Sequence, residues 1–273
     1  YYASRGLGDV YKRQGEEVAG KRILDLCAAP GGKTTLYASL AGSDGLVVAN
    51  EVNRQRAAVL ADNVRKWGLG NVAVTVNEPA QIAVLEGWFD IVAVDAPCSG
   101  EGMFRRHPET RAEWSPESPA GCAKRQAEIL DRAAKMLRPG GRIVYSTCTM
   151  NRTENEDTVD AFLSRHADFS AEAFSLPGAD APDGMLTCYP HRMKGEGHFV
   201  ALLRKHGDAP CNWQKAPEKD APSKDALQAL RAFCPTANAN VMRTGSGKPG
   251  RSRDESVTLS CLPDRPACDG IQV

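Results

Sequence analysis

The chain has 273 residues, of which 42% are hydrophobic and 25% are charged, as in an ordinary globular protein. Its 34 Lys and Arg residues balance 34 Asp and Glu residues, so the net charge is zero. An anionic partner would therefore be held by a local basic patch, because no field of the whole protein steers it. No apolar run approaches the ~20 residues of a transmembrane helix, which excludes a membrane-spanning function of that kind.

The cysteine content indicates the cellular compartment, and the two ends of the sequence indicate how much of a protein it represents. Nine cysteines, an odd number, without a recognisable signal peptide, favour a reducing cytoplasm over a disulfide framework. Residues 1–14 read YYASRGLGDVYKRQ, show neither helical nor strand periodicity, and are expected to be an artefactual leader. Residues 268–273 read as a strand that is cut short, so we expect the chain to be a fragment.

Apolar runs and helical periodicities alternate from residue 21 to about residue 165. Strands are predicted at 22–26, 46–50, 72–76, 89–94 and 142–145, followed by two late strands at 186–189 and 198–203. Helices are predicted at 33–41, from the cap Asn53 to Trp67, at 120–137, and from a Thr153–Glu156 capping box to Leu163. This alternation predicts an α/β fold: a mostly parallel, seven-stranded sheet with helices on both faces and an antiparallel strand at one edge.

Composition divides the chain into parts. The α/β domain is expected to span residues 15–206. Residues 207–223 are rich in Pro, Lys, Asp and Ala and are expected to be a linker. Residues 224–273 contain one predicted helix, near 225–233, and a basic stretch with Arg243, Lys248, Arg251 and Arg253.

A glycine-containing loop, Cys27-Ala28-Ala29-Pro30-Gly31-Gly32-Lys33, follows the first strand. It lacks the glycine spacing of a P-loop and of a dinucleotide fingerprint. An acidic residue, Glu51, ends the second strand, where a carboxylate can accept two ribose hydroxyls. Asn77 follows the third strand, where an amide could bind an adenine edge. Together these positions fit a cofactor that contains adenosine but no pyrophosphate.

Two further loops carry thiols at the ends of buried strands: Asp95-Ala96-Pro97-Cys98 and Ser146-Thr147-Cys148-Thr149. The ends of parallel strands are where open α/β sheets bind ligands, so two thiols and a carboxylate there indicate covalent attack on a substrate. Lys33 could lower a thiol pKa. A zinc site is disfavoured because the cysteines are fifty residues apart without a C-x-x-C or His pair, and no metal is expected. Arg105, Arg106 and His107 follow Cys98 and could hold a phosphate backbone.

These residues carry a specific resemblance over about residues 16–206. The segments 25–34 (DLCAAPGGKT), 95–102 (DAPCSGEG) and 145–149 (YSTCT) resemble the three signature motifs of the Sun-type (NSUN) RNA cytosine-5 methyltransferases. The bacterial RsmF-like branch, which acts on small-subunit ribosomal RNA, is the most similar, and residues 264–273 resemble the start of its C-terminal RNA-binding region. Asn77 stands where many members have Asp.

The resemblance implies a class I (Rossmann-like) methyltransferase fold and S-adenosylmethionine as the cofactor. It implies that Cys148 is the nucleophile and Cys98 its partner, while Asp95, or its protonated form, stabilises the ring nitrogen of cytosine. The implied cofactor-binding residues are Cys27, Ala28, Ala29, Pro30, Gly31, Gly32, Lys33, Glu51, Asn77 and Asp95. The implied partner is RNA, most of all ribosomal RNA, bound by a cytoplasmic monomer.

The chemistry of cytosine agrees with this assignment. Carbon 5 becomes nucleophilic only after a thiolate adds to carbon 6, and the target base must leave its stack to reach the pocket. Three alternatives stay open: the same reaction on transfer RNA, a DNA cytosine-5 methyltransferase that uses the Pro-Cys loop thiol Cys98, and a non-catalytic ribosome-assembly factor.

Overall fold

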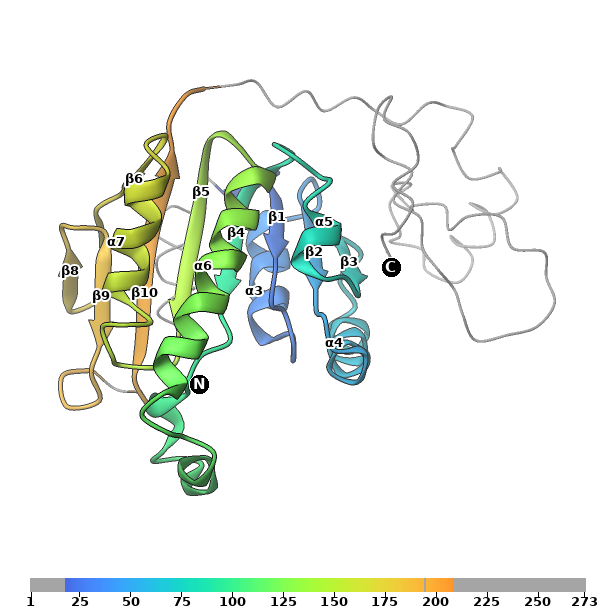
Figure 1. Cartoon of the computed structure of the whole chain (residues 1–273). Helices are drawn as coiled ribbons and strands as arrows, with labels where there is room; N and C mark the ends of the chain where they lie inside the picture. The colour runs from blue at the N-terminus through green and yellow to red at the C-terminus, as the bar shows by residue number, and fades with distance from the viewer. Residues whose placement is uncertain (1–17, 194, 209–273) are drawn as a thin grey trace, which may run out of the picture. The chain divides into compact units, whose positions relative to one another are not determined.

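The computed structural model describes residues 18–193 and 195–208 (Figure 1). The expected leader (1–14), nearly all of the expected linker (207–223) and the expected C-terminal region (224–273) lie outside these residues. The expectations for those three parts stay predictions. The α/β domain, by contrast, lies almost entirely within the described residues and carries all the candidate site residues.

The domain is built on an 8-stranded sheet with the order β3-β2-β1-β4-β5-β10-β6. Its parallel half consists of β1 (Arg22–Asp25), β2 (Leu46–Asn50), β3 (Val72–Thr75), β4 (Phe89–Asp95) and β5 (Leu137–Thr147). The next strand, β10 (His198–Lys205), runs antiparallel to β5, and β6 (Phe169–Ala171) and β9 (Met185–Cys188) pair with its other side. The predicted mostly parallel sheet is therefore confirmed, but it has eight strands instead of seven, and its antiparallel part consists of β10 with β6 and β9 instead of one edge strand.

Helices cover both faces of the sheet, because central strands are apolar on both sides. On one face lie α3 (Gly32–Ala41) and α4 (Arg54–Trp67); Tyr37 of α3 packs in one cluster with Ile23, Ile91 and Val200 of the strands. On the other face lie α6 (Ser118–Met136) and α7 (Glu156–Arg165), in front of the sheet in Figure 1. The short helix α5 (Pro79–Ile82) contacts α6.

The strand β5 begins earlier than predicted. The segment Pro139-Gly140-Gly141 reads as a helix stop, so the sequence places the strand only at 142–145. In the structure the pairing continues to Leu137 opposite Phe89, with a register shift before Arg142 opposite Ile91. Gly140 has φ 77, which glycine adopts without strain at such an irregularity.

The late part of the domain contains short strands that the sequence does not predict. These are β6 and a separate two-stranded sheet of β7 (Phe174–Leu176) and β8 (Ala179–Ala181). Each has three residues, too few to show a periodicity.

The predicted capping box at the start of α7 is wrong. The helix begins at Glu156, whose Oε1 accepts a hydrogen bond from Thr187 Oγ1 (3.0 Å) rather than from a cap residue. Asn155 is the N-cap, but its side chain is used elsewhere: Thr147 Oγ1 donates to its Oδ1 (2.6 Å), and its Nδ2 donates to the carbonyl of Thr149 (3.2 Å). The start of α7 thus holds the loop that carries Cys148.

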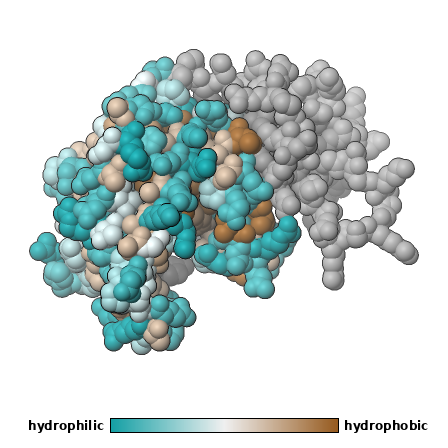
Figure 2. Space-filling view, in the orientation of Figure 1, coloured by the Kyte–Doolittle hydropathy of each residue, from teal (hydrophilic) through white to brown (hydrophobic). Residues whose placement is uncertain are grey.

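The surface of the face seen in Figure 2 is mostly hydrophilic, with small hydrophobic areas. The large hydrophobic side chains exposed in the described part of the chain include Val52, Val59, Trp67 and Val84. None of the helices within the described residues is both long and apolar enough to cross a bilayer.

Candidate active site

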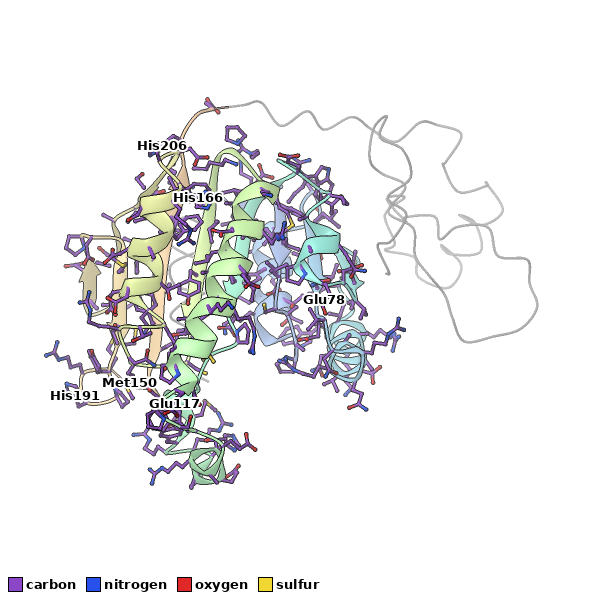
Figure 3. The ribbon with its side chains drawn as sticks, viewed as in Figure 1. Glu78, Glu117, Met150, His166, His191 and His206 are labelled. Atoms are coloured by element: carbon purple, nitrogen blue, oxygen red, sulfur yellow. The ribbon has the colours of Figure 1, made fainter. Side chains whose placement is uncertain are left out.

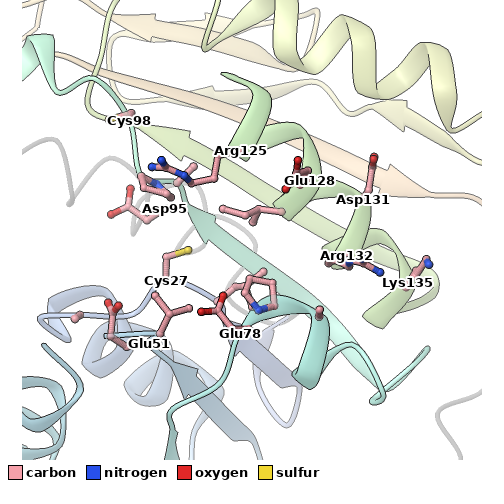
Figure 4. A pocket seen from close by; sticks show the side chains of 18 of the residues that line it. Cys27, Glu51, Glu78, Asp95, Cys98, Arg125, Glu128, Asp131, Arg132 and Lys135 are labelled. Carbon is pink, nitrogen blue, oxygen red and sulfur yellow. The ribbon is translucent and has the colours of Figure 1, made fainter. Parts of the chain in front are cut away.

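A cavity of about 950 Å³ lies where β1, β2, β4 and β5 end, and it extends along α6 (Figure 4). It brings together residues that are far apart in the sequence. The predicted site residues that line it are Cys27, Ala29, Glu51, Asp95, Cys98 and Cys148. Side chains of α6 form the opposite wall, among them Arg125, Glu128 and Arg132.

The remaining residues of the predicted cofactor loop form the turn behind this lining. Gly31 has φ 107, and a Cβ on it would lie 2.9 Å from Leu60 Cδ1, so the turn needs glycine there. Two side chains of α4 hold the turn in place: Arg56 donates to the carbonyl of Ala29 (3.0 Å), and Asn63 donates to the carbonyl of Pro30 (2.7 Å). The turn is therefore rigidly positioned at the edge of the cavity.

Glu51 presents an unsatisfied acceptor at the cavity. The residue is 3% exposed, and its Oε1 accepts a hydrogen bond from the backbone N–H of Asn53 (3.0 Å). Its Oε2 accepts no hydrogen bond, although Arg56 Nη1 lies 3.2 Å away as an ion-pair partner. A buried carboxylate oxygen without a hydrogen-bond donor suits a ligand hydroxyl, so Glu51 fits the ribose of an adenosine cofactor.

Asn77 lies deeper than the lining of the cavity. It is 2% exposed; its backbone N–H donates to Asn50 Oδ1 (3.0 Å), and its carbonyl accepts from Asn50 Nδ2 (2.9 Å). The next residue, Glu78, lines the cavity instead and lies beside α5 in Figure 3. A contact of Asn77 with adenine stays a prediction, and Glu78 is a cavity residue that the sequence did not single out.

Asp95 is an ionised carboxylate held by two donors. Lys33 Nζ lies 2.5 Å from its Oδ2, and Ser146 Oγ donates to its Oδ1 (2.8 Å). Burial acts to raise the pKa of Asp95, but Lys33, His198 and the hydrogen bond from Ser146 together outweigh burial and hold that pKa below its usual range. By contrast, burial raises the pKa of Asp25 to about 7, even though Thr34 donates to that carboxylate (2.6 Å). A protonated form of Asp95 acting on the ring nitrogen of a bound cytosine stays a prediction.

The two thiols meet at the end of β4 and β5. Cys98 Sγ and Cys148 Sγ are 3.2 Å apart, a hydrogen-bonding distance for sulfur. Donation by the Cys98 thiol lowers the pKa of Cys148, against the opposing effects of burial and of Asp95. The same bond, together with burial, raises the pKa of Cys98. The pair is therefore asymmetric: Cys148 is the thiol that ionises more readily, and Cys98 is the thiol that would donate to it.

Two buried or partly buried glutamates join the thiol loops, and the sequence alone pointed to neither. Glu154, 0% exposed, accepts hydrogen bonds from Ser99 N and Oγ, from Gln126 Nε2 (2.8 Å) and from Asn151 Nδ2 (2.9 Å). Glu101 accepts from Thr149 Oγ1 (2.8 Å). The bonds from Ser99 to Glu154 and from Thr149 to Glu101 join residues 55 and 48 positions apart, so no local pattern could reveal them.

Gly102, in the loop after Cys98, packs closely against the backbone of the Cys148 loop. The N–H of Gly102 donates to the carbonyl of Cys148 (2.8 Å). A Cβ on Gly102 would lie 2.7 Å from that carbonyl oxygen and 2.8 Å from the carbonyl oxygen of Gly197. Only glycine fits between these two backbone segments, so Gly102 sets the position of the Cys148 loop.

Of the basic residues after Cys98, Arg105 and His107 are paired with glutamates, whereas Arg106 is exposed. Arg105 is engaged by Glu196, with Nε to Oε2 at 2.9 Å and Nη2 to Oε1 at 3.0 Å. His107 Nδ1 pairs with Glu109 (3.0 Å). Arg106 is exposed beside them.

Within residues 18–193 and 195–208, no group of three or more His, Cys, Asp and Glu side chains is placed to hold a metal.

Known proteins with similar sequences are methyltransferases. A sequence model described as "16S rRNA methyltransferase RsmB/F" matches residues 14–204. "Ribosomal RNA small subunit methyltransferase F" of Serratia proteamaculans is 43% identical over 199 residues, which are 70% of this chain and 42% of that protein. The protein of the same name from Cronobacter sakazakii is 43% identical over 248 residues, 87% of this chain and 50% of that protein. The chain thus spans half or less of the length of these curated relatives.

Solved structures agree in fold. The crystal structure of NSun6 from Pyrococcus horikoshii with SFG has a TM-score of 0.63 and 29% identity, covering 74% of this chain and 53% of that one. A methyltransferase homologue from Pyrococcus horikoshii has a TM-score of 0.59 and 29% identity, covering 68% and 62%. The α/β domain therefore has the Rossmann-like methyltransferase fold that its motifs predict. The chain belongs to the 16S rRNA methyltransferase RsmB/F family.

Proposed function

We propose that the protein transfers a methyl group from S-adenosylmethionine to carbon 5 of a cytosine in RNA, and that the RNA is ribosomal. The observation that carries the proposal is the asymmetric thiol pair, with Cys98 Sγ 3.2 Å from Cys148 Sγ, in the same cavity as the ionised Asp95 and the unsatisfied oxygen of Glu51. The names of the relatives support ribosomal RNA as the substrate.

The cofactor site would be formed by the ends of β1 and β2. Bound S-adenosylmethionine supplies an electrophilic methyl group beside the thiols. Glu51 Oε2 would accept a ribose hydroxyl, because it is a buried acceptor without a hydrogen bond. The backbone of residues 27–33 would lie against the ligand, and Asp95 would offer a negative charge close to a cationic cofactor.

Cys148 would start the reaction on the cytosine. Its thiolate sulfur bonds to carbon 6, and the electron pair of the C5–C6 double bond moves into the ring toward N3 and O2. The ionised Asp95 accepts a hydrogen bond from the exocyclic amino group, which uracil lacks, and thereby selects cytosine. Lys33, held at 2.5 Å from Asp95, balances charge near the ring. Carbon 5 is then nucleophilic and would bond to the methyl carbon, whose bond to the sulfonium sulfur would break, so that the cofactor would leave as the neutral thioether S-adenosylhomocysteine.

Cys98 would complete the reaction. Its pKa is raised mainly because it donates to the Cys148 thiolate. Once Cys148 is bonded to carbon 6 that negative charge is gone, so the pKa of Cys98 falls and its thiol can release its proton to solvent water in the cavity. The Cys98 thiolate then removes the carbon 5 proton, the electron pair reforms the C5–C6 double bond, and Cys148 leaves as a thiolate.

The RNA would approach past the loop after Cys98. Arg125 and Arg132 line the cavity and Arg106 is exposed nearby, so local positive charge is available although the chain is neutral overall.

The five cysteines in the described part of the chain are free thiols, which supports action in a reducing cytoplasm. We propose that the enzyme acts there as a monomer.

Transfer of label from tritiated S-adenosylmethionine tests the proposal. The purified chain is incubated with deproteinised small-subunit ribosomal RNA, transfer RNA and DNA in parallel, and the nucleosides are separated. We expect label in 5-methylcytidine from ribosomal RNA, and no transfer by the Cys148→Ala variant. Label mainly in transfer RNA would show that the substrate is transfer RNA and not ribosomal RNA. Label in DNA would show that the enzyme is a DNA methyltransferase. Label in no sample would overturn the proposal.

A further inference from the structure

His198 is a buried imidazole beside the thiol loops whose role the proposed reaction leaves open. It begins β10 and is 6% exposed, and its Nε2 has no hydrogen-bond partner. Burial lowers the pKa of His198 to about 4, and Lys33 adds to this effect while Asp95 opposes it. The imidazole is therefore neutral, and a buried ring nitrogen without a partner is costly unless a ligand satisfies it.

The strand pattern places His198 on the same face of the sheet as Asp95. Ala93 of β4 and Val200 of β10 pack in the cluster of Tyr37, and residues two apart on a strand share a face. Asp95 and His198 each lie two residues beyond these core residues, toward the end of the sheet that carries the thiols.

The register brings His198 level with the Cys148 loop. Phe199 pairs with Thr147, so His198 lies opposite the position that follows Thr147, where Cys148 stands. The preceding residue, Gly197, packs against Gly102 of the Cys98 loop. His198 thus lies at the end of the sheet that carries the thiol loops, on the β10 side of Cys148, and it is not itself among the residues that line the cavity.

The strand order defines which edge of the cytosine His198 would meet. The order β1-β4-β5-β10 places the proposed cofactor turn and Glu51 on one side of Cys148 and His198 on the other. Carbon 5 must face the cofactor. In a pyrimidine ring carbon 2 lies diametrically opposite carbon 5, so its carbonyl oxygen O2 points away from the cofactor, toward β10.

We propose that His198 Nε2–H donates a hydrogen bond to O2 of the target cytosine, so that His198 is a substrate-contacting residue that stabilises the base during attack by Cys148. The proposal rests on the proposed cytosine-5 reaction. When Cys148 adds to carbon 6, negative charge develops on N3 and O2. A donor fixed at O2 binds that charge more strongly than it binds the neutral base, and so it accelerates the step.

The test is a double-mutant cycle between the protein and the base. A short RNA is made around the cytosine that the labelling experiment identifies, with either cytidine or 2-thiocytidine at that position. Sulfur is a weak hydrogen-bond acceptor, so the thio base removes the O2 contact. Both RNAs are measured with the wild type, His198→Phe and His198→Gln, of which Gln keeps an N–H donor. His206→Phe is the control, because His206 is exposed and lies at the opposite end of the sheet from Met150 (Figure 3).

We expect kcat/KM of the wild type and of His206→Phe to fall about tenfold with 2-thiocytidine, the loss of one hydrogen bond. His198→Phe should lose about tenfold on cytidine, in kcat more than in KM, and lose nothing further on 2-thiocytidine. His198→Gln should keep part of the rate and part of the discrimination. If His198→Phe does not fold, His198→Leu takes its place.

An undiminished 2-thio penalty in the His198→Phe variant would overturn the inference and leave the cytosine-5 reaction intact, since a group other than His198 would then donate to O2. Equal rates of His198→Phe and wild type on cytidine would overturn it as well. Failure of the wild type to methylate any cytosine would overturn the proposed function, and the role of His198 with it.

Discussion

Replacing Cys98 by alanine should make Cys148 harder to ionise. In the structure Cys98 Sγ lies 3.2 Å from Cys148 Sγ, and a hydrogen bond from Cys98 is the largest contribution to the lowered pKa of Cys148. A hydrogen bond to a charged group contributes about 1.5–3 kcal/mol, and one pKa unit corresponds to about 1.4 kcal/mol. Because sulfur is a weak donor, we take the lower limit and expect the pKa of Cys148 to rise by about one unit in Cys98→Ala.

The rate of alkylation of Cys148 by iodoacetamide, measured by peptide mass spectrometry across a range of pH, reports this pKa. The thiolate is the reactive form, so below the midpoint the rate in Cys98→Ala should be about tenfold lower than in the wild type. Cys98→Ser keeps a donor and should restore most of the reactivity. Cys188→Ala serves as the control, because burial alone accounts for the raised pKa of Cys188. An unchanged or lower midpoint in Cys98→Ala would refute the assignment of Cys98 as the donor.

Three further predictions concern the cavity and the loops around it. Glu51→Ala should weaken the binding of S-adenosylmethionine at least about tenfold in calorimetry, since it removes acceptors for ribose hydroxyls; unchanged affinity in a folded variant would reject Glu51 as a ligand. Glu154→Gln should lower the free energy of unfolding in urea by about 2 kcal/mol or more, because an amide N–H₂ would face buried donors, whereas the exposed Glu113→Gln should change it little. Gly102→Ala should reduce kcat at least about tenfold, because the added Cβ would displace the carbonyl of Cys148. Gly121→Ala is the control and should leave kcat unchanged, because there is open space around its added Cβ. Equal activities of the two variants would mean that the Cys148 loop can adjust.

The fold was predictable where periodicity and strand length are large. The strands β1, β2 and β4 and the helix α4 lie within a residue or two of their predicted positions, since apolar runs bounded by turn residues and the Asn53 cap are local signals. The first part of β5 was not predictable, because a Pro-Gly-Gly irregularity within a strand and a helix stop share one composition.

The candidate site was predictable where the residues follow strands. The ends of parallel strands meet at one edge of a sheet, so Glu51, Asp95, Cys98 and Cys148 could be brought together from their sequence positions alone. Glu154 could not be found this way, because its function depends on contacts with a loop 55 residues away. The same holds for His198, whose neighbours depend on the antiparallel register of β10 against β5.

The central claim, covalent catalysis by Cys148 with Cys98 releasing the product, is tested most directly on a denaturing gel. Each single variant is incubated with ribosomal RNA and S-adenosylmethionine and then denatured. Cys98→Ala should attack carbon 6, transfer the methyl group and stall, giving a protein–RNA species that disappears when Cys148 is also replaced. Cys148→Ala should give none. A trapped species with Cys148→Ala and none with Cys98→Ala would contradict this mechanism and assign the nucleophile to Cys98.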